Sequence, residues 1–130
     1  MMIVPNLLVT DDDGALRSLL CEALSRSGFQ VLQAADGHEA LEVLGRHTVH
    51  FALVDVHMPR VTGLELMRSL ADLPNRPPCA LMSADLTDRI VAEAKQMNVY
   101  RVLPKPIRIH QIREVVRGAL KDTYGWSAVG

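Results

Sequence analysis

The chain has 130 residues, of which 48% are hydrophobic, and this is enough for one compact domain with a buried core. Its formal net charge of −1 comes from interspersed acidic and basic residues, which excludes a broad electrostatic surface for nucleic acid or an anionic membrane. No signal peptide, transmembrane run or paired-cysteine pattern is present, so we expect a cytoplasmic protein that binds neither nucleic acid directly nor a membrane.

Short apolar runs alternate with segments of helical period along the chain. The first helical segment follows the first run and is predicted to end at Gly28, a residue suited to a helix C-terminus. Capping residues predict the starts of three later helices, at Asp36, Thr62 and Asp85. The apolar runs, each predicted to be a strand, are residues 7–10, 29–32, 51–54, 79–82 and 100–103.

Strict alternation of strand and helix indicates right-handed βαβ units, and therefore a parallel sheet with helices on both faces. We predict a single α/β domain over residues 5–121. Residues 122–130 lack periodicity and are predicted to form a C-terminal tail or the start of a linker.

Polar residues follow four of the predicted strands. Asp11 and Asp12 come after the first, Asp55 after the third, Ser83 after the fourth and Lys105 after the fifth. Ligands bind at this edge of an open parallel sheet, and clustered carboxylates favour a cation such as Mg²⁺. A carboxylate beside Mg²⁺ can attack phosphorus while a lysine and a hydroxyl offset the phosphoryl charge. Each residue alone could be a cap or a turn, but together they predict a metal site with phosphoryl chemistry on Asp55.

From Leu7 to about Leu120 the chain resembles the receiver domain of two-component response regulators. The resemblance implies a flavodoxin-like, doubly wound fold with five helices and a five-stranded sheet in the order 2-1-3-4-5. That order places Asp11 and Asp12 beside Asp55. The motifs that carry the resemblance are Asp11-Asp12, Asp55-Val56-His57-Met58-Pro59 with Gly63, Ser83-Ala84 and Lys105-Pro106.

The resemblance also implies a role for each site residue. Asp55 would accept a phosphoryl group from a sensor histidine kinase, a histidine phosphotransfer protein or a small phosphodonor. Mg²⁺ (or Mn²⁺) would be held by Asp12, by Asp55 and by the backbone carbonyl of His57, with Asp11 acting through water. Ser83 would move to hydrogen-bond the phosphoryl group, and Lys105 would pair with it.

Signalling output is expected through partner binding and not through turnover of metabolites. Under this interpretation the chain is no enzyme beyond catalysing its own phosphorylation and dephosphorylation. The surface that changes on phosphorylation would be formed by the fourth helix, fifth strand and fifth helix. A downstream effector protein, or a C-terminal output domain outside the chain, would bind it. Lys105-Pro106 is a candidate cis peptide bond.

Two features depart from the family pattern or modify it. Val102 stands where receiver domains usually carry an aromatic residue that follows the hydroxyl's movement, and Tyr100, expected on the same face, is a candidate substitute. His57 and Asp85 occupy positions that in the family influence hydrolysis of the acyl phosphate, although Asp85 is expected simply to cap a helix. The remaining histidines are predicted to be surface residues: His38, His47, His50 and His110.

Two other functions remain open from the sequence. Residues 11–16 also resemble the nucleophile motif of haloacid-dehalogenase-type phosphatases, with Asp11 as nucleophile and Asp13 as general acid. That interpretation leaves Asp55 and Gly63 unexplained and lacks a later acidic motif. The other alternative is a receiver-like interaction module that needs no phosphate, which the filled site positions disfavour.

Overall fold

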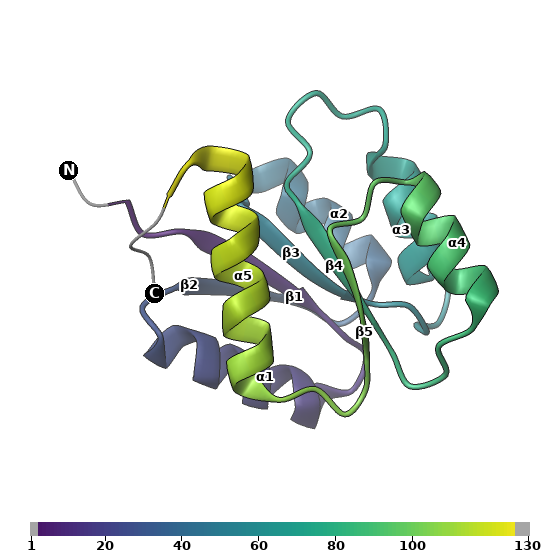
Figure 1. Ribbon diagram of the computed structural model, residues 1–130, viewed down its shortest axis with the longest axis horizontal. Coiled ribbons are helices and arrows are strands. Elements are labelled where there is room, and N and C mark those ends of the chain that lie inside the picture. Colours follow the sequence, from purple (N-terminus) through teal and green to yellow (C-terminus); the bar gives the residue numbers. More distant parts are fainter. Residues whose placement is uncertain (1–2, 127–130) are drawn as a thin grey trace.

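The computed structural model describes residues 3–126, which form a five-stranded parallel sheet between two layers of helices (Figure 1). The strand order is β2-β1-β3-β4-β5, as predicted. The strands are β1 (Asn6–Thr10), β2 (Gln30–Ala34), β3 (Phe51–Asp55), β4 (Cys79–Ser83) and β5 (Arg101–Pro104). The helices are α1 (Gly14–Arg26), α2 (Gly37–Arg46), α3 (Gly63–Leu70), α4 (Asp88–Gln96) and α5 (Ile109–Tyr124).

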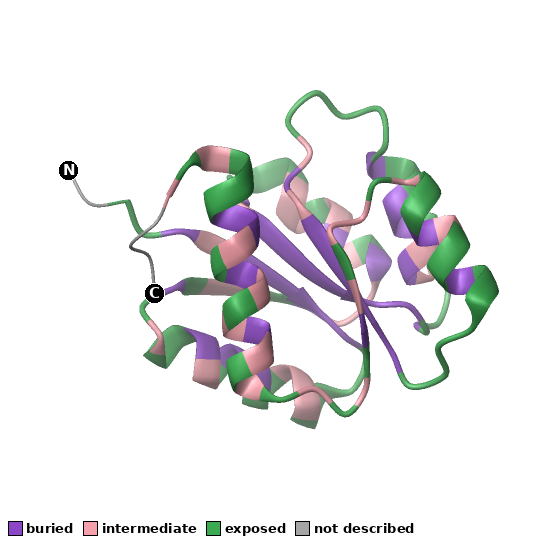
Figure 2. Cartoon of the chain, in the orientation of Figure 1, coloured by how far each residue is buried: buried purple, intermediate pink, exposed green. Residues whose placement is uncertain are grey.

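The core is divided into two apolar clusters by the sheet. One cluster packs α1 and α5 against the sheet, and the other packs α2, α3 and α4 against the opposite face. β3 and β4 are buried along their whole length because helices cover both faces (Figure 2). The α/β prediction with helices on both faces is confirmed.

Helix ends follow the predicted capping chemistry in most cases. The amides of Gly28 and Phe29 donate to the carbonyls of Ser25 and Leu24, which is a Schellman motif with Gly28 at a φ of 97°. Thr62 and Glu65 form a complete capping box at α3. The boundaries of β2 differ from prediction, because its pairing with β1 begins at residue 30 and continues to residue 34.

The prediction that Asp85 caps the fourth helix is wrong. Thr87 is the N-cap of α4, and its hydroxyl accepts a hydrogen bond from the amide of Ile90. Asp85 instead lies exposed in the preceding turn, with its own amide donating to the Ser83 hydroxyl. Both residues are good caps by type, so composition alone does not choose between them.

The C-terminal part of α5 continues past residue 121, and Tyr124 contacts His50, the residue before β3. The Tyr124 hydroxyl donates to the His50 carbonyl at 3.0 Å, and the Tyr124 ring stacks on Trp126. The prediction that His50 is a surface residue is wrong, because its ring is half-buried against these aromatics. The predicted tail falls partly on residues 127–130, which lie outside the described residues. Within residues 3–126, every helix is too short or too polar to cross a membrane.

Candidate functional site

Three carboxylates meet where the neighbouring strands β1 and β3 end. Thr10 of β1 pairs with Val54 of β3, so the next residues, Asp11 and Asp55, lie at the same end of the sheet. Candidate ligand atoms of Asp11, Asp12 and Asp55 all lie within 4.8 Å of one another. Asp11 and Asp55 are buried and Asp12 is exposed. The acidic pocket expected from the sequence is therefore present.

Asp11 is held by contacts to both carboxylate oxygens. Its Oδ1 accepts from the amide of Asp13 at 2.9 Å, and its Oδ2 accepts from Lys105 Nζ at 2.9 Å. The guanidinium of Arg17 also donates to the Asp11 carbonyl at 2.6 Å. Both oxygens of Asp11 therefore already accept a hydrogen bond from the protein, which leaves each with one further acceptor site.

The Asp55 carboxylate lies at the end of β3 and is only 3% exposed. Burial and the neighbouring charge of Asp11 raise its pKa, while the charge of Lys105 and the amide of His57 oppose that rise. Lys105 Nζ lies 3.5 Å from Asp55 Oδ1. Two nearby acids thus share one cation from the protein, and this excess of negative charge favours a further positive group.

Lys105 is positioned by the backbone at the end of β5. Its amide donates to the Ser83 carbonyl at 2.8 Å, and its peptide bond to Pro106 is cis, as the sequence suggested. Burial lowers the pKa of the Lys105 ammonium, but the hydrogen bond and charge of Asp11, together with Asp55, outweigh burial and raise it. Lys105 therefore remains a cation between the two acids.

Ser83 is buried at the end of β4, and its hydroxyl is engaged by the loop after β3. The Ser83 Oγ lies 3.0 Å from His57 Nε2 and accepts from the amide of Asp85 at 3.1 Å. The His57 amide points inward to Asp55 Oδ1 at 3.3 Å. From the sequence, His57 was expected to act through its carbonyl and to influence hydrolysis of the acyl phosphate. Its ring contact with Ser83 was missed, because no local pattern links residues 26 apart.

Gly63 explains how the loop after β3 returns so close to the site. Its amide donates to the Val56 carbonyl at 2.9 Å. A Cβ at this position would lie 2.5 Å from the Asp55 carbonyl oxygen and 2.8 Å from Val56 Cα. Any side chain would therefore push against the backbone that carries Asp55.

Residues 7–117 match the response regulator receiver domain family over most of the chain. The chain belongs to this family. Phosphoacceptor function in two-component signalling, predicted from the sequence, is thereby confirmed at the level of the family. Receiver domains generally bind Mg²⁺ at an acidic cluster, and Asp11, Asp12 and Asp55 form such a cluster here.

Related receiver proteins differ in how much of their length the chain covers. The chain is 32% identical over 120 residues to "Regulator of RpoS" of Escherichia coli K12, covering 92% of the chain but 36% of that protein. It is 27% identical over 116 residues to "Sporulation initiation phosphotransferase F" of Bacillus subtilis, covering 89% and 94%. A Burkholderia pseudomallei response regulator, solved with a phosphorylated aspartic acid, a calcium ion and citrate, matches with a TM-score of 0.81 and 26% identity, covering 93% and 71%.

The receiver site also accounts for residues on which the phosphatase interpretation relied. Asp13, the general acid in that interpretation, is the N-cap of α1, and its carboxylate accepts from the amides of Ala15 and Leu16. Asp55 and Gly63, which the phosphatase interpretation left unexplained, lie at the centre of the site. The geometry and the family match both favour the receiver interpretation.

Tyr100 does not lie where an aromatic switch of a receiver domain would. It precedes β5 and packs in the α1–α5 cluster, whereas Val102 packs in the cluster on the opposite face, so the expectation of a shared face is wrong. Strand alternation does not extend to Tyr100 because the residue lies outside the strand. Its hydroxyl donates to Asp122 of α5 at 2.9 Å, at the opposite end of β5 from the pairing of Ser83 with Pro104.

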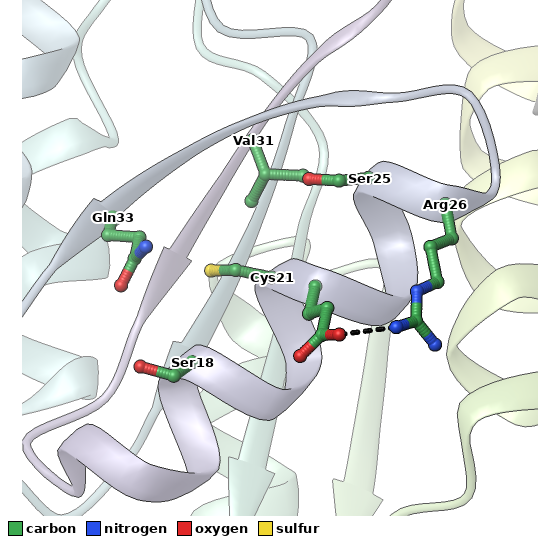
Figure 3. A pocket seen from close by; sticks show the side chains of 7 residues that line it. Ser18, Cys21, Ser25, Arg26, Val31 and Gln33 are labelled. Atoms are coloured by element: carbon green, nitrogen blue, oxygen red, sulfur yellow. Dashed lines mark hydrogen bonds and ion pairs between the residues drawn. The ribbon is translucent and has the colours of Figure 1, made fainter.

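A cavity between α1 and β2 lies away from the receiver site (Figure 3). Cys21 faces it, and burial raises the pKa of this thiol to about 11, so the thiol stays protonated and unreactive at neutral pH. Glu22 and Arg26, two of the lining residues, form an ion pair with each other. The full lining is Ser18, Cys21, Glu22, Ser25, Arg26, Val31 and Gln33.

Proposed function

We propose that Asp55 is the phosphorylation site of this receiver domain. A carboxylate oxygen of Asp55 attacks the phosphorus of a phosphohistidine, an O–P bond forms, the P–N bond breaks, and the imidazole leaves with the electron pair. The donor is a sensor histidine kinase or a histidine phosphotransfer protein, with a small phosphodonor as the alternative source. The observation that carries this proposal is the convergence of a buried Asp55 with two other carboxylates and the Lys105 ammonium.

The metal in this proposal is Mg²⁺ or Mn²⁺, held by oxygen ligands. Asp12, Asp55 and the backbone carbonyl of His57 would bind it directly, while Asp11, whose oxygens accept hydrogen bonds already, would act through water. The metal would supply charge neutralisation for the incoming phosphoryl group. The Burkholderia regulator with a phosphorylated aspartic acid and calcium supports such a pairing of metal and acyl phosphate.

Ser83 and Lys105 are proposed to stabilise the phosphorylated state. Lys105 already lies 3.5 Å from Asp55, so new phosphoryl oxygens would fall within reach of its ammonium. Ser83 would contribute its single hydroxyl proton. The domain would act on no metabolite, catalysing only its own phosphorylation and dephosphorylation, and its phosphorylated surface would bind a cytoplasmic effector protein or an output domain.

Intact-mass measurement after incubation with acetyl phosphate and Mg²⁺ tests the assignment of Asp55. We expect one added phosphoryl mass on the parent chain, loss of the adduct when the metal is chelated, and no adduct on Asp55→Asn. Asp13→Asn is the matched control, because it changes an acid that caps α1 and lies outside the cluster; it should still be phosphorylated. An adduct that persists on Asp55→Asn would show that another acid is the nucleophile.

A second measurement separates metal binding from signalling. Ser83→Ala and Lys105→Ala should keep Mg²⁺ affinity within a few-fold of the parent, because neither side chain is a proposed metal ligand. Both should weaken the structural response to phosphorylation, since a ligand shifts an equilibrium only through differential contacts. Normal phosphorylation-dependent changes in both variants, followed by amide NMR shifts of α4 and α5, would contradict the proposed roles.

A further inference from the structure

The His57 ring joins the buried hydroxyl of Ser83 to the protein surface. Ser83 is 1% exposed, whereas His57 is an exposed residue of the loop between β3 and α3. Their side chains meet with Nε2 and Oγ 3.0 Å apart. The same ring lines a cavity of about 290 Å³ between the N-terminal ends of α3 and α4, together with residues that include Thr62, Thr87 and Ile90.

With His57 Nε2 as the acceptor, the Ser83 hydroxyl cannot keep this arrangement and also donate its proton to a phosphoryl group. A hydroxyl has one proton and two acceptor sites, and the amide of Asp85 already uses one acceptor site. The remaining contact, to His57 Nε2, either uses the Ser83 proton or fills its second acceptor site, depending on the ring tautomer. In both cases the ring fixes the rotamer of Ser83 in the state without phosphate.

We propose that His57 is a positioning residue that holds Ser83 in the resting state, and that phosphorylation releases its ring. The proposal rests on the proposed phosphorylation of Asp55. In the tautomer whose Nε2 is the acceptor, donation by Ser83 to the phosphoryl group uses the single hydroxyl proton. The bond to Nε2 then breaks, and the freed ring alters the cavity that it lines. This gives the site a route to the surface through the loop after β3.

The contact of His57 with Ser83 supplies a connection to the surface that β5 does not. Val102 has no aromatic ring to follow Ser83, and Tyr100 is tied to Asp122 at the far end of the strand. A residue that carries a change at Ser83 to the surface must contact Ser83 and be exposed. His57 has both properties. The hydrogen bond between His57 and Ser83 opposes donation by Ser83 to the phosphoryl group. Removing this bond should therefore favour the state in which Ser83 contacts the phosphoryl group.

Binding of beryllofluoride, a phosphoryl mimic, in the presence of Mg²⁺ tests the proposal as an equilibrium. The amide signal of Asp85, which is bonded to the Ser83 hydroxyl, serves as the NMR probe. His57→Leu should bind beryllofluoride roughly two- to tenfold more tightly, as expected from loss of one net hydrogen bond in the resting state. His57→Gln, which can still hydrogen-bond Ser83, should fall closer to the parent.

A double-mutant cycle with Ser83→Ala distinguishes this role from a steric effect of the ring. In the Ser83→Ala background, His57→Leu should no longer change the affinity, because the group that it positions is gone. An equal gain in beryllofluoride affinity in both backgrounds would overturn the proposal. So would an unchanged affinity of His57→Leu, provided that its urea midpoint equals that of the parent and the variant is therefore folded. If the parent neither binds beryllofluoride nor forms an adduct with acetyl phosphate, the assignment of Asp55 fails instead.

Discussion

The hydroxyl of Thr10 is fully buried at the end of β1 and has no hydrogen-bond partner among residues 3–126. A buried, unpaired hydroxyl loses its hydration without compensation. Thr10→Val keeps the shape of the side chain and removes the polar atom, so we expect the free energy of unfolding to rise by about 1 kcal/mol. Urea denaturation measures the change.

Thr62→Val is the matched control for this substitution. The Thr62 hydroxyl accepts from the amide of Glu65 and caps α3, so the same chemical change should lower the free energy of unfolding by about 1 kcal/mol. A fall in the free energy of unfolding for both variants would show that the Thr10 hydroxyl has a partner such as a buried water.

Asp55 illustrates a site residue whose function opposes stability. Burial and the charge of Asp11 disfavour its ionised form, and Lys105 offsets them only in part. Asp55→Asn should therefore raise the free energy of unfolding by about 1 kcal/mol in EDTA. Added Mg²⁺ should narrow the difference, because the parent binds the metal more tightly than the variant. A less stable variant in EDTA, measured by urea denaturation, would mean that attraction to Lys105 dominates.

The start of α3 is constrained by the site, because Gly63 lies against the backbone of Asp55 and Val56. Gly63→Ala would place a methyl group 2.5 Å from the Asp55 carbonyl oxygen, where only backbone could move away. We expect a loss of about 1–3 kcal/mol in the free energy of unfolding and slower phosphorylation. Thermal melting and the acetyl phosphate assay measure the two effects.

Gly45→Ala in α2 is the control for Gly63→Ala. Apart from its chain neighbours and the backbone of α2 itself, no heavy atom of residues 3–126 lies within 4 Å of the Cβ that the substitution adds. Alanine has the higher helix propensity, so the variant should gain about 0.5–1 kcal/mol. A similar loss at both glycines would show that crowding is not the cause at position 63.

Strands and helices were predictable from the sequence because most are buried on the faces that their apolar periods mark. The strand ends also carried the acidic residues, Ser83 and Lys105, which the order β2-β1-β3-β4-β5 brings to one end of the sheet. Details set by tertiary pairing were not predictable. The start of β2 depends on its register with β1, and the cap of α4 depends on which of two good capping residues the turn presents.

The contacts of single side chains were least predictable. Tyr100 leaves the face expected of it because it precedes the strand, and the His57 ring reaches Ser83 of β4 from the loop after β3. Neither contact has a signal in local sequence, since periodicity describes positions within one element. The acidic pocket could thus be foreseen, whereas the path from it to the surface could not.

At the scale of the whole molecule, residues near both ends of the described chain contact His50, which precedes β3 at the end of the sheet opposite the acidic pocket. The amide of Asn6 in β1 donates to His50 Nδ1 at 2.9 Å, and the His50 ring packs edge-on against Tyr124 and Trp126. His50 therefore couples the start of the sheet to the end of α5. Burial lowers its pKa below the usual 6.5.

This lowered pKa makes the stability of the whole domain depend on pH. As pH falls through about 6.5, the unfolded chain takes up a proton at His50 and the folded chain does not, so the free energy of unfolding decreases. His50→Gln should make the free energy of unfolding fall less between roughly pH 7.5 and pH 5.5, measured by urea denaturation. His110→Gln, which changes an exposed histidine of α5, should keep the parent's decrease. If both variants retained the parent's pH dependence, His50 would not be the group that links protonation to the packing of the chain ends.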